Sequence, residues 1–359
     1  MNSIQQRATA YLRKALNSPQ ADFRDGQWAS IQALVENRTR LLVVQRTGWG
    51  KSMVYFLATR LLRDQGRGLT LLISPLLALI RNQIEATERI GLRAVSINST
   101  NVDDWPTLEA EILANKVDLL LISPERLAND QFRQHVLTRI AQRVGLFVVD
   151  EAHCISDWGH DFRPDYRRIV RILQAMPPNI PVLATTATAN NRVVSDVVDQ
   201  IGKGLQVVWG PLGRASLLLQ TLDLPNRSQR LPWLAHTIPQ LPGSGIVYTR
   251  TKRDADRVAE WLVHKGIRAD AYHADRGVED RIELEEKLQH NRLKAIVATS
   301  ALGMGYDKPD LGFVIHFQRP GSVVEYYQQV GRAGRGQNTP PKKGVPSPPG
   351  GMGGSRVPG

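Results

Sequence analysis

The sequence predicts an α/β protein with two domains, each built on a mostly parallel sheet. Apolar runs of strand length alternate with helical patterns along most of the chain, which is typical of parallel strands joined by crossover helices. The chain has 359 residues and 42% apolar content, enough for two ordinary domain cores. A turn-rich segment divides the apolar runs into a group of five and a group of three.

Eight apolar runs are expected to be strands. In chain order they are RLLVVQ (40–45), LTLLISP (69–75), VDLLLISP (117–124), LFVVDE (146–151), VLATTAT (182–188), GIVYT (245–249), AIVATS (295–300) and FVIHF (313–317). The first five would belong to the sheet of one domain and the last three to the sheet of the other.

The boundary between the domains is predicted in the turn-rich segment 207–224. From Gln337 onward the chain has six prolines and six glycines in 23 residues and no apolar periodicity, so this tail is expected to be disordered. The expected divisions are 1–208 for the first domain, 209–336 for the second domain and 337–359 for the tail.

Composition limits the class of protein. No uninterrupted apolar stretch reaches about 18 residues, and the N-terminus MNSIQQRATAYLRKAL lacks a secretory signal pattern, which together indicate a protein of the cell interior. The single cysteine, Cys154, excludes an internal disulfide and a four-cysteine zinc site made by this chain alone. The net charge of +12 and pI near 10 favour a polyanionic partner, although a merely basic protein has the same composition.

The stretch RLLVVQRTGWGKS (40–52) has the pattern of a strand, a glycine-containing turn and a helix start. In a phosphate loop, backbone N–H groups such as those around Thr47, Gly48 and Gly50 hold the phosphates. Lys51 would reach the β and γ oxygens, and the Ser52 hydroxyl would ligate Mg²⁺. Gln45 stands where the usual pattern has its first glycine, so an ordinary strand-to-helix turn is the alternative.

The run LFVVDE ends in two carboxylates about a hundred residues later. Asp150 can hold Mg²⁺ and Glu151 can orient an attacking water. Acidic residues at a strand end are often only solvated turn residues, but their occurrence after a phosphate-loop pattern favours nucleotide hydrolysis.

The chain resembles the RecQ family of superfamily 2 helicases over about residues 20 to 335. The similar segments are FRDGQ (23–27), TGWGKS (47–52), SPLLALIRNQ (74–83), SPERL (123–127), DEAHCISDWGHDFRPDY (150–166), TTAT (185–188), VATSALGMGYDKP (297–309) and YYQQVGRAGR (326–335). The continuation of DEAH into an aromatic-rich loop is the most specific of these signals.

The resemblance implies two RecA-like lobes, each a mostly parallel sheet with helices on both faces, and ATP with Mg²⁺ between them. Gln27, in one motif with Arg24, would read the adenine edge, or would be an exposed glutamine at a helix start. Arg332 and Arg335 would reach the γ-phosphate as finger residues, or would be plain surface arginines. Asp307 would accept from the ribose hydroxyl, or would be an ordinary turn aspartate.

The aromatic-rich loop is expected to sense DNA. Trp158 and Phe162 offer faces for base stacking, while His160 and Arg163 can contact phosphate or nearby backbone. Because the loop follows the catalytic carboxylates closely, bound DNA would shift the loop and the loop would shift them. The alternative is that the rings fill a small satellite core, and for Tyr166 both interpretations stay open.

His153 is expected to connect the γ-phosphate side to Thr186 and Thr188 of the TTAT motif. It is not expected to bind zinc, because no second His or Cys stands at ligand spacing. Cys154 is expected to be a buried bystander. Further strand-binding residues implied by the resemblance are Ser74, Arg81 and Gln328.

The function predicted is an ATP-dependent, 3′-to-5′ DNA helicase or translocase acting on single-stranded and partly duplex DNA. Three alternatives stay open: a DNA-stimulated ATPase that unwinds poorly, RNA as the strand, and a binding protein with a decayed ATP site. The first follows because no zinc-binding or winged-helix region succeeds the sixth motif, where a truncated, frame-shifted or naturally short C-terminus is expected. No membrane association and no zinc are expected, and the predicted location is a bacterial cytoplasm, with the nucleoid, or a eukaryotic nucleus.

Overall fold

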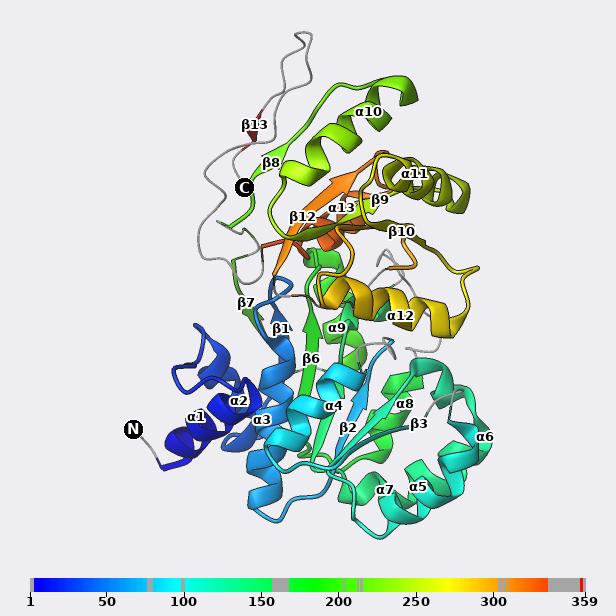
Figure 1. The fold of residues 1–359 in the computed structure, drawn as a ribbon. Coiled ribbons are helices and arrows are strands. Elements are labelled where there is room, and N and C mark those ends of the chain that lie inside the picture. Colours follow the sequence, from blue (N-terminus) through cyan, green and yellow to red (C-terminus); the bar gives the residue numbers. More distant parts are fainter. Residues whose placement is uncertain are drawn as a thin grey trace. The chain divides into compact units, whose positions relative to one another are not determined.

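The computed structural model describes most of the chain (Figure 1). The described residues are 3–75, 80–97, 101–156, 168–202, 204–211, 213, 216–302, 306, 308, 310–334 and 356–357. Contacts divide the chain into a first unit, Met1–Leu212, and a second unit, Gly213–Gly359.

The first unit is built on a seven-stranded sheet in the order β3-β4-β2-β5-β6-β1-β7, and every pairing in it is parallel. The strands are β1 Arg40–Val44, β2 Thr70–Ile73, β3 Ala94–Ile97, β4 Leu119–Ile122, β5 Leu146–Val149, β6 Val182–Thr186 and β7 Gln206–Trp209. β5 lies between β2 and β6, and β1 lies beside β6. The carboxyl ends of β1, β5 and β6, which carry three of the predicted motifs, therefore meet at one edge of the sheet.

Helices cover both faces of this sheet. They are α1 Ser3–Ala15, α2 Gln27–Val35, α3 Lys51–Asp64, α4 Ile80–Arg89, α5 Trp105–Leu113, α6 Asp130–Phe132, α7 Thr138–Ile140, α8 Arg168–Ala175 and α9 Asn191–Ile201. Leu41 and Val43 pack with residues of α1, α2 and α3, which are blue in Figure 1, whereas Leu42 and Val44 pack on the opposite face with residues of α8 and α9. Successive residues of a strand point to opposite faces, so a strand buried on both faces has the uninterrupted apolar run seen in the sequence.

The second unit has a four-stranded parallel sheet in the order β10-β11-β9-β12. Its strands are β9 Ser244–Tyr248, β10 Ala269–Tyr272, β11 Ala295–Ala298 and β12 Leu311–His316. Its helices are α10 Arg227–Thr237, α11 Lys252–His264, α12 Val278–Gln289 and α13 Val323–Val330. Residues of α10 and α11 pack on one face, and Leu284 and Leu288 of α12 pack on the other.

Side-chain caps explain where three of the helices begin. The side chains of Asn190, Thr251 and Ser322 each accept a hydrogen bond from the backbone N–H three residues later, before α9, α11 and α13 respectively. Such a cap satisfies one of the N–H groups that a helix start leaves without an intrahelical partner.

The predicted α/β class, with parallel sheets and helices on both faces, is confirmed in both units. All eight predicted strands are present, but three strands of the two large sheets, β3, β7 and β10, were not among the predicted runs. β7 begins at the edge of the segment that we expected to be only turn-rich. Within 337–359 the structure describes only β13, Arg356–Val357, which pairs antiparallel with β8, Leu219–Gln220.

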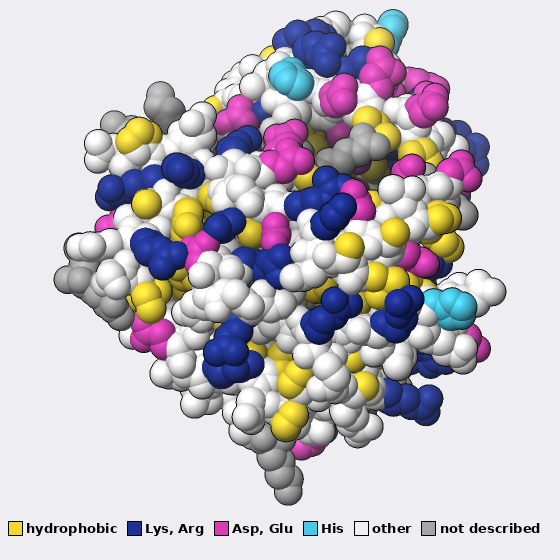
Figure 2. Space-filling model, turned by 90° about the horizontal axis from the view of Figure 1, so that it is seen from below, with side chains coloured by type: hydrophobic (Ala, Val, Ile, Leu, Met, Phe, Trp, Pro, Cys, Tyr) yellow, Lys and Arg dark blue, Asp and Glu magenta, His cyan; other side chains and the backbone are white. Residues whose placement is uncertain are grey.

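The described residues contain no helix long and apolar enough to cross a membrane. Figure 2 shows one face of the molecule, where Lys and Arg side chains are distributed among acidic and apolar ones. On this face the net positive charge of the chain does not form a single continuous stripe.

Candidate functional site

The predicted phosphate loop connects β1 to α3 in the first unit. Gly48 and Gly50 have φ angles of 79° and 93°, in the left-handed region that favours glycine. Helix α3 begins at Lys51 and runs for 14 residues, so the positive end of its dipole lies at the loop. This arrangement favours binding of an anion such as phosphate.

Lys51 lies over the first half of the loop. Its Nζ donates to the backbone O of Gln45 at 3.0 Å and approaches that of Arg46 at 3.5 Å. Gln45, which replaces the usual first glycine, has a buried side chain and continues β1 through a hydrogen bond from its N–H to Thr186 O. The substitution is therefore accommodated in the interior, outside the turn that holds the left-handed glycines.

Gln27 is 4% exposed and joins its own segment to the phosphate loop. Its Nε2 donates to Trp49 O at 2.8 Å and its Oε1 accepts from Arg24 N at 2.8 Å. The Arg24 guanidinium also donates to Gly48 O. The structure thus brings the predicted adenine-reading residues directly beside the predicted phosphate loop.

Asp150 follows β5, and its carboxylate accepts from Thr185 Oγ1 at 2.5 Å. Burial raises the pKa of Asp150 to about 6, and the neighbouring Glu151 charge adds to this shift. The Thr185 hydrogen bond and the Lys51 charge act in the opposite direction. A buried carboxylate with a raised pKa is a group whose charge a cation would stabilise.

Glu151 has φ 50°, a left-handed conformation that costs energy for a residue other than glycine and is found disproportionately at functional sites. Its Oε2 lies 3.2 Å from His153 Nδ1. The same nitrogen lies 3.0 Å from Thr186 Oγ1, which donates to Thr188 O and accepts from Thr188 N. Because the Thr186 hydroxyl already donates to Thr188 O, it can only accept from His153, which assigns the ring proton to Nδ1.

The donor set fits Mg²⁺, because the Asp150 carboxylate and the Ser52 hydroxyl are both hard oxygen ligands. Ser52 is partly exposed in the first turn of α3. The described residues contain no cluster of three or more His, Cys, Asp or Glu side chains that would form a separate metal site.

Of the other predicted residues, the structure describes some fully, one without its side chain and some not at all. Ser74 is buried after β2, and its N–H donates to Ile122 O. Arg81 lies in α4, but its side chain is outside the described part. Predicted residues that lie wholly outside the described residues are Trp158, His160, Phe162, Arg163, Tyr166, Asp307 and Arg335.

In the second unit, Gln328 lies on α13, and Arg332 follows the end of that helix. Arg332 is only 4% exposed, and its Nη1 donates to Tyr306 O at 2.9 Å. The bond ties the end of α13 to the segment that precedes Asp307.

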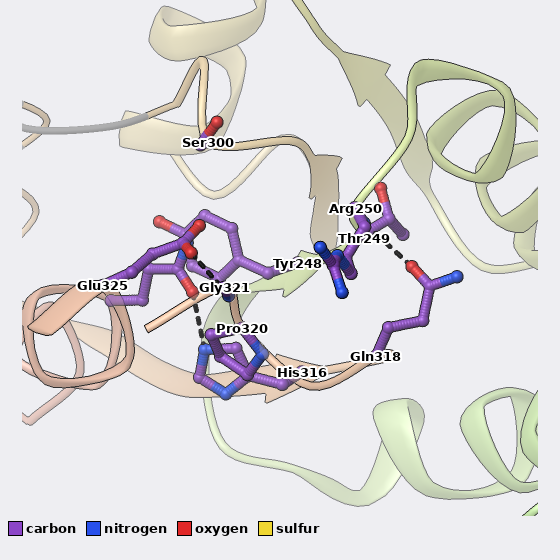
Figure 3. A pocket seen from close by; sticks show the side chains of 10 residues that line it. Tyr248, Thr249, Arg250, Ser300, His316, Gln318, Pro320, Gly321 and Glu325 are labelled. Carbon is purple, nitrogen blue, oxygen red and sulfur yellow. Dashed lines mark hydrogen bonds between the residues drawn. The ribbon is translucent and has the colours of Figure 1, made fainter. Parts of the chain in front are cut away.

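A pocket of about 200 Å³ lies at the carboxyl ends of β9, β11 and β12 in the second unit (Figure 3). Its lining includes Thr249 and Arg250 after β9, Ser300 after β11 and Gln318 after β12. Figure 3 also labels His316, Gly321 and Glu325 among the residues that line the pocket. Strands β11 and β12 flank β9 on opposite sides, and such switch points in parallel sheets are common ligand sites.

Both units match known helicase domains. Residues 24–197 match the family described as DEAD/DEAH box helicase, and residues 231–337 match the helicase conserved C-terminal domain. The ATP-dependent DNA helicase RecQ of Bacillus subtilis is 36% identical over 318 residues, which are 87% of this chain and 52% of that protein. The ATP-dependent DNA helicase Q1 of Rattus norvegicus is 34% identical over 87% of this chain and 51% of its own length.

The chain belongs to the RecQ family of DEAD/DEAH box helicases. It spans about half the length of the curated RecQ relatives that it matches.

Solved helicase structures share the fold of this RecQ-family chain. The Mycobacterium smegmatis helicase Lhr, bound to single-stranded DNA and AMP-PNP, has a TM-score of 0.73 at 23% identity and covers 94% of this chain and 47% of its own. The helicase MrfA bound to DNA has a TM-score of 0.77 at 17% identity, with 95% and 50% coverage. These likenesses support two RecA-like units.

Sequence reasoning missed several residues of the candidate sites in the two units. Thr185, which binds Asp150, lies inside the TTAT motif but was not singled out. Trp49 and the second-unit pocket were also missed, although Trp49 is an unusual residue type between two loop glycines and the pocket residues directly follow predicted strands.

Proposed function

We propose that this RecQ-family chain is an ATP-dependent DNA motor that hydrolyses ATP and moves 3′ to 5′ along single-stranded DNA. One observation carries the proposal: Asp150, raised in pKa by burial, lies within electrostatic reach of Lys51, which sits on a glycine loop at the start of a helix. Relatives of which this chain covers about half are named ATP-dependent DNA helicases, and this supports both ATP and DNA as substrates.

In the proposed reaction, the loop N–H groups around Thr47, Gly48 and Gly50 hold the phosphates. Lys51 exchanges the loop carbonyls for the β and γ oxygens. Ser52 and Asp150 would hold Mg²⁺, which would supply positive charge to neutralise the phosphate oxygens.

Glu151 is placed to orient the attacking water. Its Oε2 lies 3.2 Å from Nδ1 of the buried His153. His153 is in turn held by Thr186, so a shift of the segment 186–188 would move the imidazole beside the Glu151 carboxylate. Arg332 and Arg335 of the second unit are proposed to stabilise charge on the γ-phosphate, with Asp307 on the ribose.

The DNA strand is proposed to contact the residues that follow the strands of both units. In the first unit these are Ser74, Arg81, Trp158, His160, Phe162 and Arg163, with Thr186 and Thr188 transmitting the contact. In the second unit, Arg250 and the hydroxyls of Thr249 and Ser300 give the pocket groups that bind phosphate, and Gln328 lies on the adjacent helix. A DNA motor belongs where DNA is, in a bacterial cytoplasm or a eukaryotic nucleus.

The assignment of the ATP site is tested with Lys51→Ala and Glu151→Gln. Each is expected to lower ATP turnover by about a hundredfold or more, because one loses the phosphate cation and the other the water-orienting carboxylate. Glu151→Gln should keep ATP affinity, since Lys51, Ser52 and Asp150 remain. Steady-state phosphate release and equilibrium ATP binding measure the two quantities, and wild-type turnover in either variant would refute the assignment.

The direction of movement is tested separately. A partial duplex with a 3′ single-stranded overhang should be unwound, or a streptavidin block displaced, in preference to the same duplex with a 5′ overhang. Equal action on both substrates would exclude the proposed direction, and ATP turnover without action on either would indicate a DNA-stimulated ATPase.

A further inference from the structure

Trp49 stands between the two left-handed glycines of the phosphate loop, yet its side chain points into the protein. It is 5% exposed and packs with the core residues of α1, α2 and α3. Its indole Nε1 donates to Asp25 O at 3.2 Å, and its ring lies against Gly26, where an added Cβ would meet Trp49 Cζ2 at 3.8 Å.

The backbone of Trp49 makes a second contact to the same segment. Trp49 O accepts from Gln27 Nε2 at 2.8 Å, and Gly50 O lies 3.4 Å from the same atom. A Cβ on Gly50 would come within 2.7 Å of Gln27 Nε2, so the two segments touch at this point. Because a trans peptide directs its C=O and N–H to opposite sides, the Gly50 N–H points away from Gln27.

The position of Gln27 depends on these contacts. Gly26 has φ 77° and is the residue from which α2 starts, so its backbone direction sets where the Gln27 side chain emerges. The indole fixes the carbonyl of Asp25 and covers Gly26, the two residues before Gln27. Among the standard side chains in this position, tryptophan combines a large buried ring with a donor at its far edge.

We propose that Trp49 is a positioning residue that joins base recognition to phosphate binding, so that the adenine preference of the site depends on it. This inference rests on the proposed ATP site and names a residue that acts through Gln27. Trp49 itself contacts the segment 25–27 and the loop interior.

Trp49→Phe tests this inference because it keeps an aromatic ring and deletes the indole N–H. Dissociation constants are measured by calorimetry in the presence of Mg²⁺ for ATP, GTP and inorganic tripolyphosphate. The variant should lose about threefold to tenfold in ATP affinity, the range for one neutral hydrogen bond. Its affinity for tripolyphosphate should stay within about twofold, and its preference for ATP over GTP should fall.

Trp261→Phe is the matched control. Trp261 Nε1 donates to Leu231 O at 3.0 Å within the second unit, so this substitution removes the same type of bond away from the phosphate loop. All three affinities should equal those of the wild type. Gln27→Ala supplies a second comparison, because adding Trp49→Phe to it should cost little further ATP affinity if both act through one contact.

The outcomes separate this inference from the proposed function. A wild-type chain that binds neither ATP nor tripolyphosphate would overturn both. Equal losses of ATP and tripolyphosphate affinity in Trp49→Phe would show that the ring only supports the phosphate loop, and would overturn this inference alone. Unchanged affinities in Trp49→Phe, or additive losses in the double variant, would do the same.

Discussion

Asp150 carries a charge that the fold buries. Asp150 is only 7% exposed, and the negative charge of the neighbouring Glu151 repels its carboxylate. Thr185 and Lys51 compensate only in part, since the pKa remains raised to about 6. The residue therefore costs stability in the nucleotide-free chain, and we expect its charge to serve the proposed metal site.

Asp150→Asn should stabilise the nucleotide-free chain while abolishing ATP turnover. At pH 7.5 the expected gain is about 1 to 3 kcal/mol, since one pKa unit corresponds to about 1.4 kcal/mol and coupling to Lys51 reduces the gain. Denaturant unfolding followed by circular dichroism measures it. Asp103→Asn, which changes an exposed acid, is the control and should have no effect.

The pH dependence of this difference has a definite sign. Because the folded-state pKa lies above the ordinary value of 3.8, the folded chain takes up a proton between about pH 4 and pH 6 that the unfolded chain has released. The stability of the wild type relative to Asp150→Asn should fall as the pH rises through this window and stay level above it. A variant less stable than the wild type at pH 7.5 would contradict the account of Asp150.

At the scale of single residues, the sequence predicts the role of a residue when the neighbours that position it belong to the same motif. Lys51, Ser52, Asp150 and Glu151 follow from contiguous patterns, because the turn and helix start that position them are local. Thr185 could not be assigned to Asp150 in the same way. That contact exists because β5 and β6 are neighbours, and strand order is a property of the folded sheet.

Among the elements of the two large sheets, the strands that the sequence did not predict are all at sheet edges. β3 and β7 end the seven-stranded sheet, and β10 is one edge of the four-stranded sheet. Their sequences AVSI, QVVW and ADAY include polar residues, and β3 and β7 are only partly buried. An edge strand has a neighbour on one side only and often lies near solvent, so it does not need the long apolar run of a central strand.

Helix α13 is attached to β12 by a chain of side-chain bonds. His316 Nε2 lies 2.7 Å from Gln329 Oε1, and Gln329 Nε2 donates to Glu325 Oε1 at 3.0 Å. Glu325 Oε2 accepts from Gly321 N at 2.8 Å, a bond drawn in Figure 3. The His316 ring also stacks on Tyr248 of β9. Side chains that line the pocket therefore connect β9 and β12 to α13, the helix before Arg332.

Gln329→Leu should weaken this attachment. Gln329 is 6% exposed, and the substitution removes both of its bonds at similar side-chain volume, at an expected cost of about 1 to 3 kcal/mol. Since α13 leads to Arg332, kcat for ATP should fall more than KM changes. Thermal unfolding and steady-state kinetics measure the two effects.

Val323→Ala is the control on the same helix, because Val323 is 82% exposed and should affect neither quantity. A Gln329→Leu protein with wild-type melting temperature and kcat would show that the bonded chain does not position α13.

For the whole molecule, the net charge of +12 bears on DNA affinity more than on its specificity. Phosphate contacts release counterions, so the affinity for single-stranded DNA should fall steeply as salt rises from about 50 to 200 mM. Fluorescence anisotropy of a labelled oligonucleotide measures this slope. An affinity independent of salt would argue against strand binding through Lys and Arg side chains.

The central claim is that strand binding controls ATP hydrolysis at Asp150 and Glu151, and one measurement tests it directly. The ATP hydrolysis rate of the chain is measured without nucleic acid, with single-stranded DNA and with single-stranded RNA of the same sequence at matched salt. We predict a low basal rate that DNA raises strongly and RNA raises less, with a rate about a hundredfold or more below that of the wild type under every condition for Glu151→Gln. A wild-type rate that DNA leaves unchanged, or hydrolysis at the wild-type rate in Glu151→Gln, would contradict the account.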